Sequence, residues 1–203
     1  MVTEVKKIVI TGGPCGGKTT ALERIRTHFS NLGYTVVIIP ETATELILGG
    51  ISPQTTLTNQ DFQHCLLMLQ MEKEKYFEWG AVRLKGAEKI LLLCDRGAMD
   101  NKAYTYKGEF SNILSLVKTT EDELLSRYDA VFHLVTAAKG AEEFYTFSNN
   151  AARYETIEEA VEMDNRLINA WQNHPHHTII DNSTDFDTKL NRLVGKISQF
   201  LAT

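Results

Sequence analysis

The sequence has few cysteines and no long apolar run, and both absences limit the class of protein. Only three of its 203 residues are cysteines, at positions 15, 65 and 94. Their odd number and wide spacing exclude a disulfide framework and a paired-cysteine metal site, so we expect a reducing compartment. No segment approaches the roughly 18 apolar residues of a membrane-spanning helix, and the apolar run at residues 8–10 is too short for a secretory signal. A cytoplasmic protein without a membrane span is therefore expected.

A strong excess of one charge is also absent. The sequence has 21 Lys and Arg against 26 Asp and Glu, a formal net charge of -5 at pH 7, and no long run of like charge. This balance disfavours a protein that coats nucleic acid or adheres to anionic membranes. A small anionic ligand remains compatible with it, because only the charge close to such a ligand matters. The length and the 43% hydrophobic composition fit a single domain over residues 1–203.

Short aliphatic runs alternate with longer segments of helical periodicity. Most of the runs contain three or more consecutive apolar residues, which is typical of strands buried on both faces of a sheet. Parallel neighbours need crossover helices, so the alternation predicts a doubly wound parallel α/β fold with about five strands. The expected strands are residues 7–11, 35–39, 89–94, 130–135 and 178–180. The expected helices are residues 19–32, 58–83, 111–117, 121–127, 156–173 and 186–201, the last capped by Ser183, Thr184 or Asp185.

The first expected strand leads into a glycine-rich segment that opens the first expected helix. Residues 12–19, GGPCGGKT, satisfy the pattern G-x-x-x-x-G-K-[ST] in the strand-to-helix context that a P-loop requires. Glycines let backbone N–H groups turn toward a phosphate, and the helix N-terminus adds partial positive charge. A glycine-rich turn without a ligand is the alternative. The residues expected to contact the nucleotide here are Gly12, Gly13, Pro14, Cys15, Gly16, Gly17, Lys18, Thr19 and Thr20.

Five residues receive separate roles in binding Mg²⁺ with ATP or GTP. Lys18 is expected to reach the β- and γ-phosphates, Thr19 to ligate Mg²⁺, and Thr20 to bond the α-phosphate. Asp95 directly follows the third expected strand, at the tip where open α/β sheets bind ligands, and is expected to hold Mg²⁺ directly or through water. Arg96 would then clamp a phosphate. A solvated turn or a local ion pair is the alternative for Asp95 and Arg96.

Glu41 directly follows the second expected strand. A carboxylate there accepts the proton of an attacking hydroxyl if a phosphoryl group is transferred to an alcohol. Alternatively, it only complements the dipole of the following helix. On the long helix the apolar spacing indicates core packing, while Gln63, Gln70 and Tyr76 are candidates to face an acceptor.

Two segments near the C-terminal end of the sheet also contain polar residues. Residues 174–177, HPHH, are interpreted as a turn, because no second group of metal ligands lies at a recognisable spacing. Asp181 and Asn182 follow the last expected strand. Each either reads the edge of a nucleotide base or caps the following helix.

Six short blocks of the sequence, given at the end of this paragraph, resemble the P-loop AAA-type domain shared by NadR-like ribosylnicotinamide kinases and TRPL-translocation-defect proteins. The resemblance to the latter is closer. The resemblance spans about residues 7–182 and implies a nucleoside-kinase-like fold with strand order 2-3-1-4-5. It also implies that ATP or GTP binds with its base near Asn182, and that a lid at residues 137–155 brings Lys139 and Arg153 over the phosphates. The blocks are ITGGPCGGKTTAL, PETATELILGGI, CDRGAMDNKAY, GAEEFYT, AARYETIEEA and HPHHTIIDN.

Two classes of function are consistent with these features. One is a phosphotransferase with a nucleoside-like acceptor, which Glu41 and the Asp95–Arg96 pair favour. The other is a nucleotide-dependent switch read by a protein partner, which the small number of basic residues in the lid favours. A conventional small GTPase is disfavoured because the only Asn-Lys pair, at 101–102, is followed by Ala-Tyr rather than by x-Asp. An AAA+ motor is disfavoured because only one helix follows the last strand.

Overall fold

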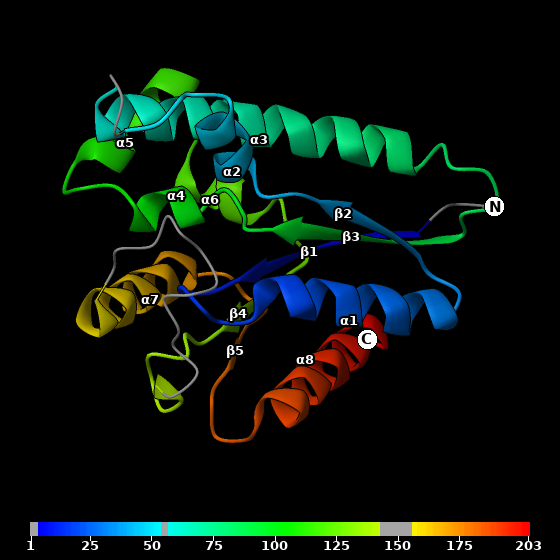
Figure 1. The fold of residues 1–203 in the computed structure, drawn as a ribbon. Coiled ribbons are helices and arrows are strands. Elements are labelled where there is room, and N and C mark those ends of the chain that lie inside the picture. Colours follow the sequence, from blue (N-terminus) through cyan, green and yellow to red (C-terminus); the bar gives the residue numbers. More distant parts are fainter. Residues whose placement is uncertain (1–3, 54–56, 143–155) are drawn as a thin grey trace.

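The computed structural model describes residues 4–53, 57–142 and 156–203. Within these ranges the chain forms a five-stranded parallel sheet with the order β2-β3-β1-β4-β5 (Figure 1). This confirms the expected fold class and strand order. The strands are β1 (Glu4–Thr11), β2 (Thr35–Ile39), β3 (Lys89–Asp95), β4 (Ala130–Leu134) and β5 (His177–Ile180).

Helices cover both faces of the sheet (Figure 1). α1 (Lys18–Asn31) and α8 (Phe186–Leu201) pack on one face. The helices α3 (Asn59–Ala81), α4 (Asp100–Ala103), α5 (Glu109–Val117), α6 (Glu121–Leu125) and α7 (Ile157–Trp171) pack on the other. The short α2 (Thr42–Leu48) lies against α3.

The apolar residues of the central strand β1 form an unbroken run because helices cover both faces of the strand. Ile8, Val9 and Ile10 are all fully buried. Successive side chains of a strand point to opposite faces. Val9 therefore packs in the core beneath α3 and α7, while Ile8 and Ile10 pack beneath α1 and α8. Burial on both faces is the expected property of a parallel sheet covered by crossover helices.

Several element boundaries differ from the sequence-based expectations. β1 begins at Glu4 rather than at residue 7, because its pairing with β3 continues to Lys89. α2 was expected only as a helix start after Glu41, without bounds, and α4 was not expected at all, since four to seven residues carry too little periodicity. Asp185 caps α8 by accepting a hydrogen bond from Thr188 N, so one of the three expected caps is confirmed.

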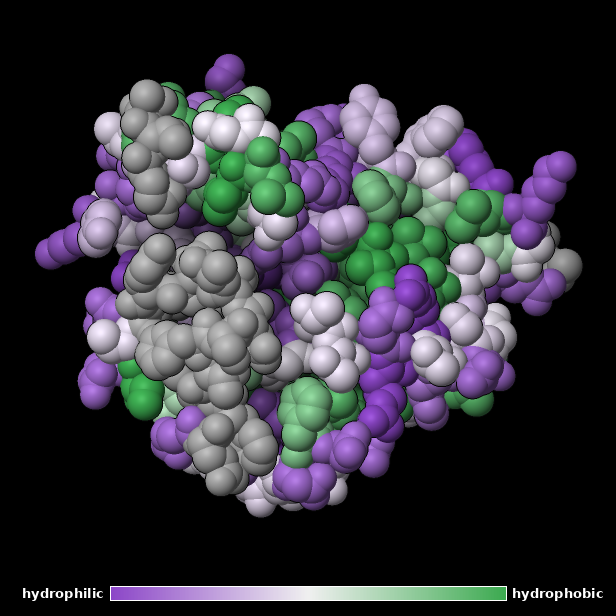
Figure 2. Space-filling model, in the orientation of Figure 1, coloured by the Kyte–Doolittle hydropathy of each residue, from purple (hydrophilic) through white to green (hydrophobic). Residues whose placement is uncertain are grey.

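Some hydrophobic side chains reach the surface. β2 is an edge strand with half-buried side chains at residues 35–38, and Figure 2 shows an apolar area over this edge. On α2, Leu48 is 83% exposed. Among the described residues, none of the helices has the length and apolar character needed to cross a membrane.

Candidate nucleotide and acceptor site

The glycine-rich loop between β1 and α1 is shaped by its packing against the rest of the fold. Gly17 precedes α1 with a φ of 87°, and a Cβ at this position would lie 2.5 Å from a ring carbon of Phe186. Gly12 has a φ of 146°, and its Cβ would lie 2.1 Å from the carbonyl oxygen of Leu134. Only glycine tolerates both the backbone conformation and the close approach. The loop thus takes a fixed P-loop course over β4 and α8.

Lys18, the first residue of α1, turns back over this loop. Its Nζ donates to the carbonyl oxygens of Gly12 at 3.2 Å and Gly13 at 3.4 Å. Removal from water and the charge of Arg96 lower the pKa of Lys18 to about 8, although the carboxylate of Asp95 opposes the shift. An ammonium whose hydrogen bonds to the described residues go to neutral carbonyls is placed to bind a phosphate oxygen, which is a stronger, charged acceptor.

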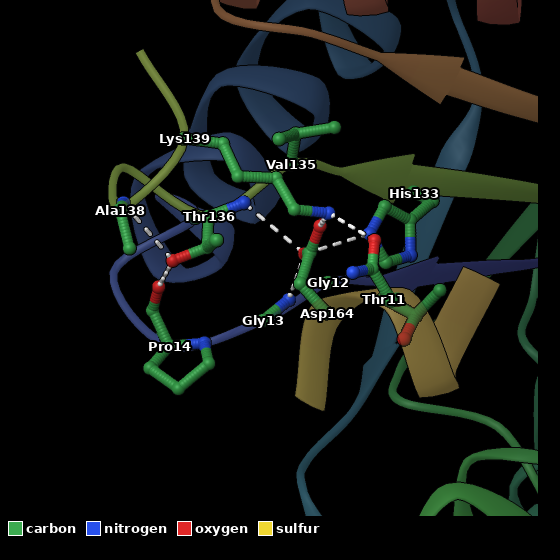
Figure 3. A network of polar contacts seen from close by, with 12 residues as sticks. Thr11, Gly12, Gly13, Pro14, His133, Val135, Thr136, Ala138, Lys139 and Asp164 are labelled. Carbon is green, nitrogen blue, oxygen red and sulfur yellow. Dashed lines mark hydrogen bonds and ion pairs between the residues drawn. The ribbon is translucent and has the colours of Figure 1, made fainter. Parts of the chain in front are cut away.

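A buried carboxylate on α7 fixes the start of the loop, as Figure 3 shows. Oδ1 of Asp164 accepts from Gly13 N at 3.0 Å and Thr136 N at 3.1 Å, and it lies 2.9 Å from His133 Nε2. Oδ2 accepts from Lys139 Nζ at 2.6 Å. Burial opposes ionisation of Asp164, but the bonds and charges of His133 and Lys139 outweigh it and lower the pKa to about 2. Asp164 therefore joins the P-loop to the segment after β4 and to α7.

A buried lysine on α8 supports the other end of the loop. Nζ of Lys189 donates to Val135 O at 2.7 Å, to Asn182 Oδ1 at 2.6 Å and to Gly16 O at 3.4 Å. Burial lowers the pKa of Lys189 to about 8. The buried anion Asp164 thus holds the loop at Gly13, and the buried cation Lys189 holds it at Gly16.

Sequence reasoning missed Asp164 and Lys189, although the pattern contained a signal for both. Each is a charged residue on the buried face of an amphipathic helix. Asp164 shares that face with Ala160 and Leu167, and Lys189 shares it with Leu190. Charged residues are almost never fully buried without partners. Their position in the periodic pattern could therefore have identified them as parts of a polar network.

The structure corrects one expectation for the segments after β4 and β5 and gives the partners of two expected site residues there. Lys139 pairs with Asp164 and Asn165, and its position over the phosphates remains a prediction. Asp181 and Asn182 do not cap α8, because Asp185 does. Both amide hydrogens of Asn182 are used, since Nδ2 donates to the carbonyl oxygens of Thr136 and Lys139. A nucleotide base could meet only the remaining lone pair of Oδ1.

The expected lid is described only in part. Ala137 and Ala138 are buried and pack against Ala160 of α7 and Cys15 of the P-loop. The beginning of the segment is thus part of the packed structure. Residues 143–155, with Arg153, lie outside the described residues, and their role remains a prediction.

The ends of β2 and β3 meet beside the P-loop. Arg96 has a φ of 69°, and its backbone N donates to Ile10 O at 3.1 Å. Its Nε lies 2.5 Å from Glu41 Oε1, and its Nη1 donates to Gly12 O at 3.4 Å. Burial raises the pKa of Glu41, but the charge of Arg96 and hydrogen bonds from Thr44 and Arg96 lower it overall. The expected proton acceptor and the expected phosphate clamp therefore form an ion pair, which leaves Glu41 ionised.

Asp95 meets the requirements of a metal ligand. Its Oδ1 is buried and has no hydrogen-bond partner among the described residues. Burial raises the pKa of Asp95, although the charge of Lys18 opposes this. A buried carboxylate oxygen without a donor fits Mg²⁺, which prefers oxygen ligands. Thr19, exposed on the first turn of α1, supplies the hydroxyl that the P-loop pattern assigns to the same ion.

A cavity of about 480 Å³ opens beside the P-loop and extends between α2, α3 and α4. Gln63 and Gln70 line it, as expected. The expectation for Tyr76 is wrong, because this side chain is 64% exposed and does not line the cavity. The lining residues at the nucleotide end are Pro14, Glu41, Arg96, Gly97 and Asp100. Those farther in include Ile47, Asn59, Phe62, Leu66 and Asn101.

Residues 174–176 form a turn before β5, and His177 is the first residue of that strand. The ring of His174 bonds to Tyr128 O and accepts from His176 N. The described part of the chain contains no group of three His, Cys, Asp or Glu residues arranged to hold a metal ion. The turn agrees with the interpretation made from the sequence.

A comparison with known families agrees with this geometry. Residues 7–189 match the family model described as an AAA domain. The matched range contains the P-loop, both strand ends that adjoin it, all of α7 and the start of α8 as far as Lys189. No curated protein matches the chain. The chain belongs to this AAA domain family, whose P-loop binds a nucleotide.

Proposed function

We propose that the protein transfers the γ-phosphoryl group of ATP or GTP to a hydroxyl of a nucleoside-like small molecule. The supporting observation is the cavity next to the P-loop. Pro14 of the loop lines it, and Arg96 lines it while bonding to Gly12 O. A volume of about 480 Å³ lies within the range of small-molecule sites. A protein that only hydrolysed a nucleotide would need no second cavity.

The transfer forms a bond between the acceptor oxygen and the γ-phosphorus. The bond between this phosphorus and the β–γ bridging oxygen breaks, and the nucleoside diphosphate leaves with that electron pair. Glu41 accepts the hydroxyl proton, because it lines the nucleotide end of the cavity and is ionised. Arg96 orients Glu41, and Lys18 neutralises the charge that develops on the phosphate oxygens.

Thr19 and Asp95 would hold the Mg²⁺ that accompanies the nucleotide. The ion supplies charge neutralisation at the phosphates. Asp95 suits this task because its Oδ1 is buried without a donor among the described residues. In this proposal the chain acts as one domain in the cytoplasm, and its kinase-like blocks reflect common ancestry with NadR-like kinases.

Incubation with γ-labelled ATP or GTP tests the proposal. Pools of nucleosides, nucleotides and ribosylated precursors are added separately, and the products are analysed for labelled acceptor. We expect one pool to accept label with the wild-type protein and none with Lys18→Ala. Label in inorganic phosphate alone, at a rate that no pool changes, would refute phosphoryl transfer.

A nucleotide-dependent switch is the second candidate, and one observation favours it. Lys139, expected over the phosphates, is bound to Asp164 within the network that holds Gly13. A nucleotide that attracted Lys139 would alter this network, and a protein partner could read the change. The same labelling assay separates the two functions, because a switch labels no acceptor.

A further inference from the structure

Three side-chain amides line the cavity. Gln63 and Gln70 project from α3 and Asn101 from α4, and all three are at most 6% exposed. Apolar side chains of Phe62 and Leu66 lie among the same lining residues. Buried amide groups are normally hydrogen-bonded in proteins. The partners of these three amides therefore indicate what a ligand has to provide.

The orientation of Asn101 follows from its partners. Its Nδ2 donates to Ala98 O at 2.9 Å and to Gln70 Oε1 at 3.2 Å. Ala98 O can only accept, so the nitrogen rather than the oxygen faces it. Gln70 is fixed in the same way, because its Nε2 donates to Arg96 O at 3.3 Å. A chain of three bonded groups thus runs from the turn at Arg96 to Asn101.

Two carbonyl oxygens of these amides are left over. Oδ1 of Asn101 and Oε1 of Gln63 are buried and have no hydrogen-bond partner among the described residues. An unpaired buried acceptor costs free energy, which a donor on a ligand recovers. Both side chains line the same cavity. A ligand that binds in this cavity through an N–H or O–H group would supply the missing partner.

The carboxylates that line the cavity already have hydrogen-bond partners within the protein. Glu41 bonds to Arg96 and Thr44. Asp100 accepts from Thr11, Trp171 and Gly97 N. The two unmatched groups are neutral acceptors, so a neutral donor suits them better than an ion, which would lose its hydration without a counter-charge.

From this pattern we infer that the cavity selects acceptors with a neutral, hydrogen-donating amino group, which Gln63 Oε1 and Asn101 Oδ1 receive. The acceptor hydroxyl then lies near Glu41, which lines the same cavity. This inference rests on the proposed function for the role of the hydroxyl, but the recognition of the amino group is a binding property. It predicts discrimination between compounds that differ only in that group.

Binding to the full chain tests the inference without any turnover. The probes are adenosine against nebularine and cytidine against zebularine, because the second member of each pair lacks the amino group. Affinities are measured by calorimetry with and without a non-hydrolysable ATP analogue. We expect the amino compound of at least one pair to bind at least about tenfold more tightly. Equal affinities within both pairs, as when water satisfies the amides, or no binding by any probe, would overturn the inference.

The variant Gln63→Leu removes Oε1 while keeping a side chain of similar size. We expect it to reduce the preference for the amino compound to below about threefold, with unchanged affinity for the ATP analogue. Gln60→Leu is the matched control, because Gln60 lies on the same helix outside the cavity lining and bonds to Asn112. A full preference in a folded Gln63→Leu protein would also overturn the inference.

The outcomes separate the two proposals. If an amino compound binds with the expected preference but receives no label, the recognition is correct and phosphoryl transfer is not. If label is transferred equally to both members of each pair, the transfer is correct and the recognition is not.

Discussion

The carboxylate of Glu41 and the guanidinium of Arg96 form an ion pair, with 2.5 Å between Oε1 and Nε, at the entrance to the cavity. The pair joins the ends of β2 and β3, two neighbouring strands of the sheet. Arg96 also bonds to Gly12 O of the P-loop. The ion pair thus connects the candidate acceptor site with the candidate nucleotide site.

Glu41→Gln tests the proton acceptor. The amide keeps the size of the side chain but cannot take a proton, so we expect turnover to fall by about 10²–10⁴-fold. Nucleotide affinity should change little. Because the pKa of Glu41 is lowered, the wild-type rate should persist to pH values below the usual carboxylate range before protonation abolishes it.

Glu45→Gln is the matched control for this substitution. Glu45 lies one turn further along α2, pairs with Lys73 and does not line the cavity. Its neutralisation should leave turnover unchanged. Equal rates for wild type and Glu41→Gln would remove Glu41 from the mechanism.

Lys18→Ala tests the phosphate contact. A hydrogen bond to a charged group contributes about 1.5–3 kcal/mol, and we expect Mg-nucleotide affinity to weaken by that amount. The pKa of about 8 for Lys18 adds a second expectation. A bound phosphate favours the charged amine, so at pH 9 the protein should take up about one proton for each nucleotide that binds.

Calorimetry in two buffers of different ionisation enthalpy measures this uptake. At pH 7 Lys18 is already protonated and the uptake should be small. Lys18→Ala should lose the uptake at pH 9, which separates Lys18 from Lys189, whose pKa is also about 8. The same proton uptake in both proteins would exclude Lys18 as its source.

Much of the fold and part of the site could be predicted from the sequence. The buried strands, the P-loop and the positions of Glu41 and Asp95 at strand ends follow from local patterns and from the geometry of parallel sheets. The Glu41–Arg96 ion pair joins two segments 55 residues apart. Such a contact depends on how the strand ends meet in space, which periodicity does not determine. Local ion pairing had been only one of the alternatives for Arg96.

The residues that hold the P-loop show the same limit. Asp164 reaches Gly13 across 151 residues of sequence. The glycine pattern explains the course of the loop, but its partners come from α7 and α8. Asn182 was expected either to contact the nucleotide base or to cap the following helix. Its amide hydrogens bond to Thr136 O and Lys139 O, and Asp185 is the residue that caps α8.

Asp164→Asn tests the buried network of Figure 3. The pKa falls from 3.8 to about 2 on folding, which corresponds to about 2 kcal/mol. Because the folded pKa is the lower one, this stability is present above about pH 4 and is lost as the pH falls toward 2. Asp164→Asn should lower the free energy of unfolding at pH 7 by about that amount and flatten its decline below pH 4.

Denaturant unfolding between pH 2 and pH 7 measures both effects. Asp122→Asn is the control, because Asp122 is exposed on α6. An Asp164→Asn protein with the same acid-dependent loss as the wild type would show that Asp164 does not carry this charge interaction.

Lys189→Met tests whether the buried cation on α8 positions the P-loop. Methionine fills similar space but cannot donate, so Val135 O, Asn182 Oδ1 and Gly16 O each lose a donor. A buried acceptor without a donor costs about 1–3 kcal/mol. We therefore expect the free energy of unfolding to fall by about 2–4 kcal/mol, and Mg-nucleotide binding to weaken because Gly16 is no longer fixed.

The pH dependence of stability gives a second test of Lys189. Its folded pKa lies below its ordinary value, so burying the charge costs stability below about pH 8, and this cost disappears at higher pH. The stability difference between wild type and variant should therefore grow between pH 8 and pH 10, whereas Lys196→Met, exposed on the same helix, should show neither effect. Lower stability with unchanged nucleotide affinity would make Lys189 a support of the fold alone.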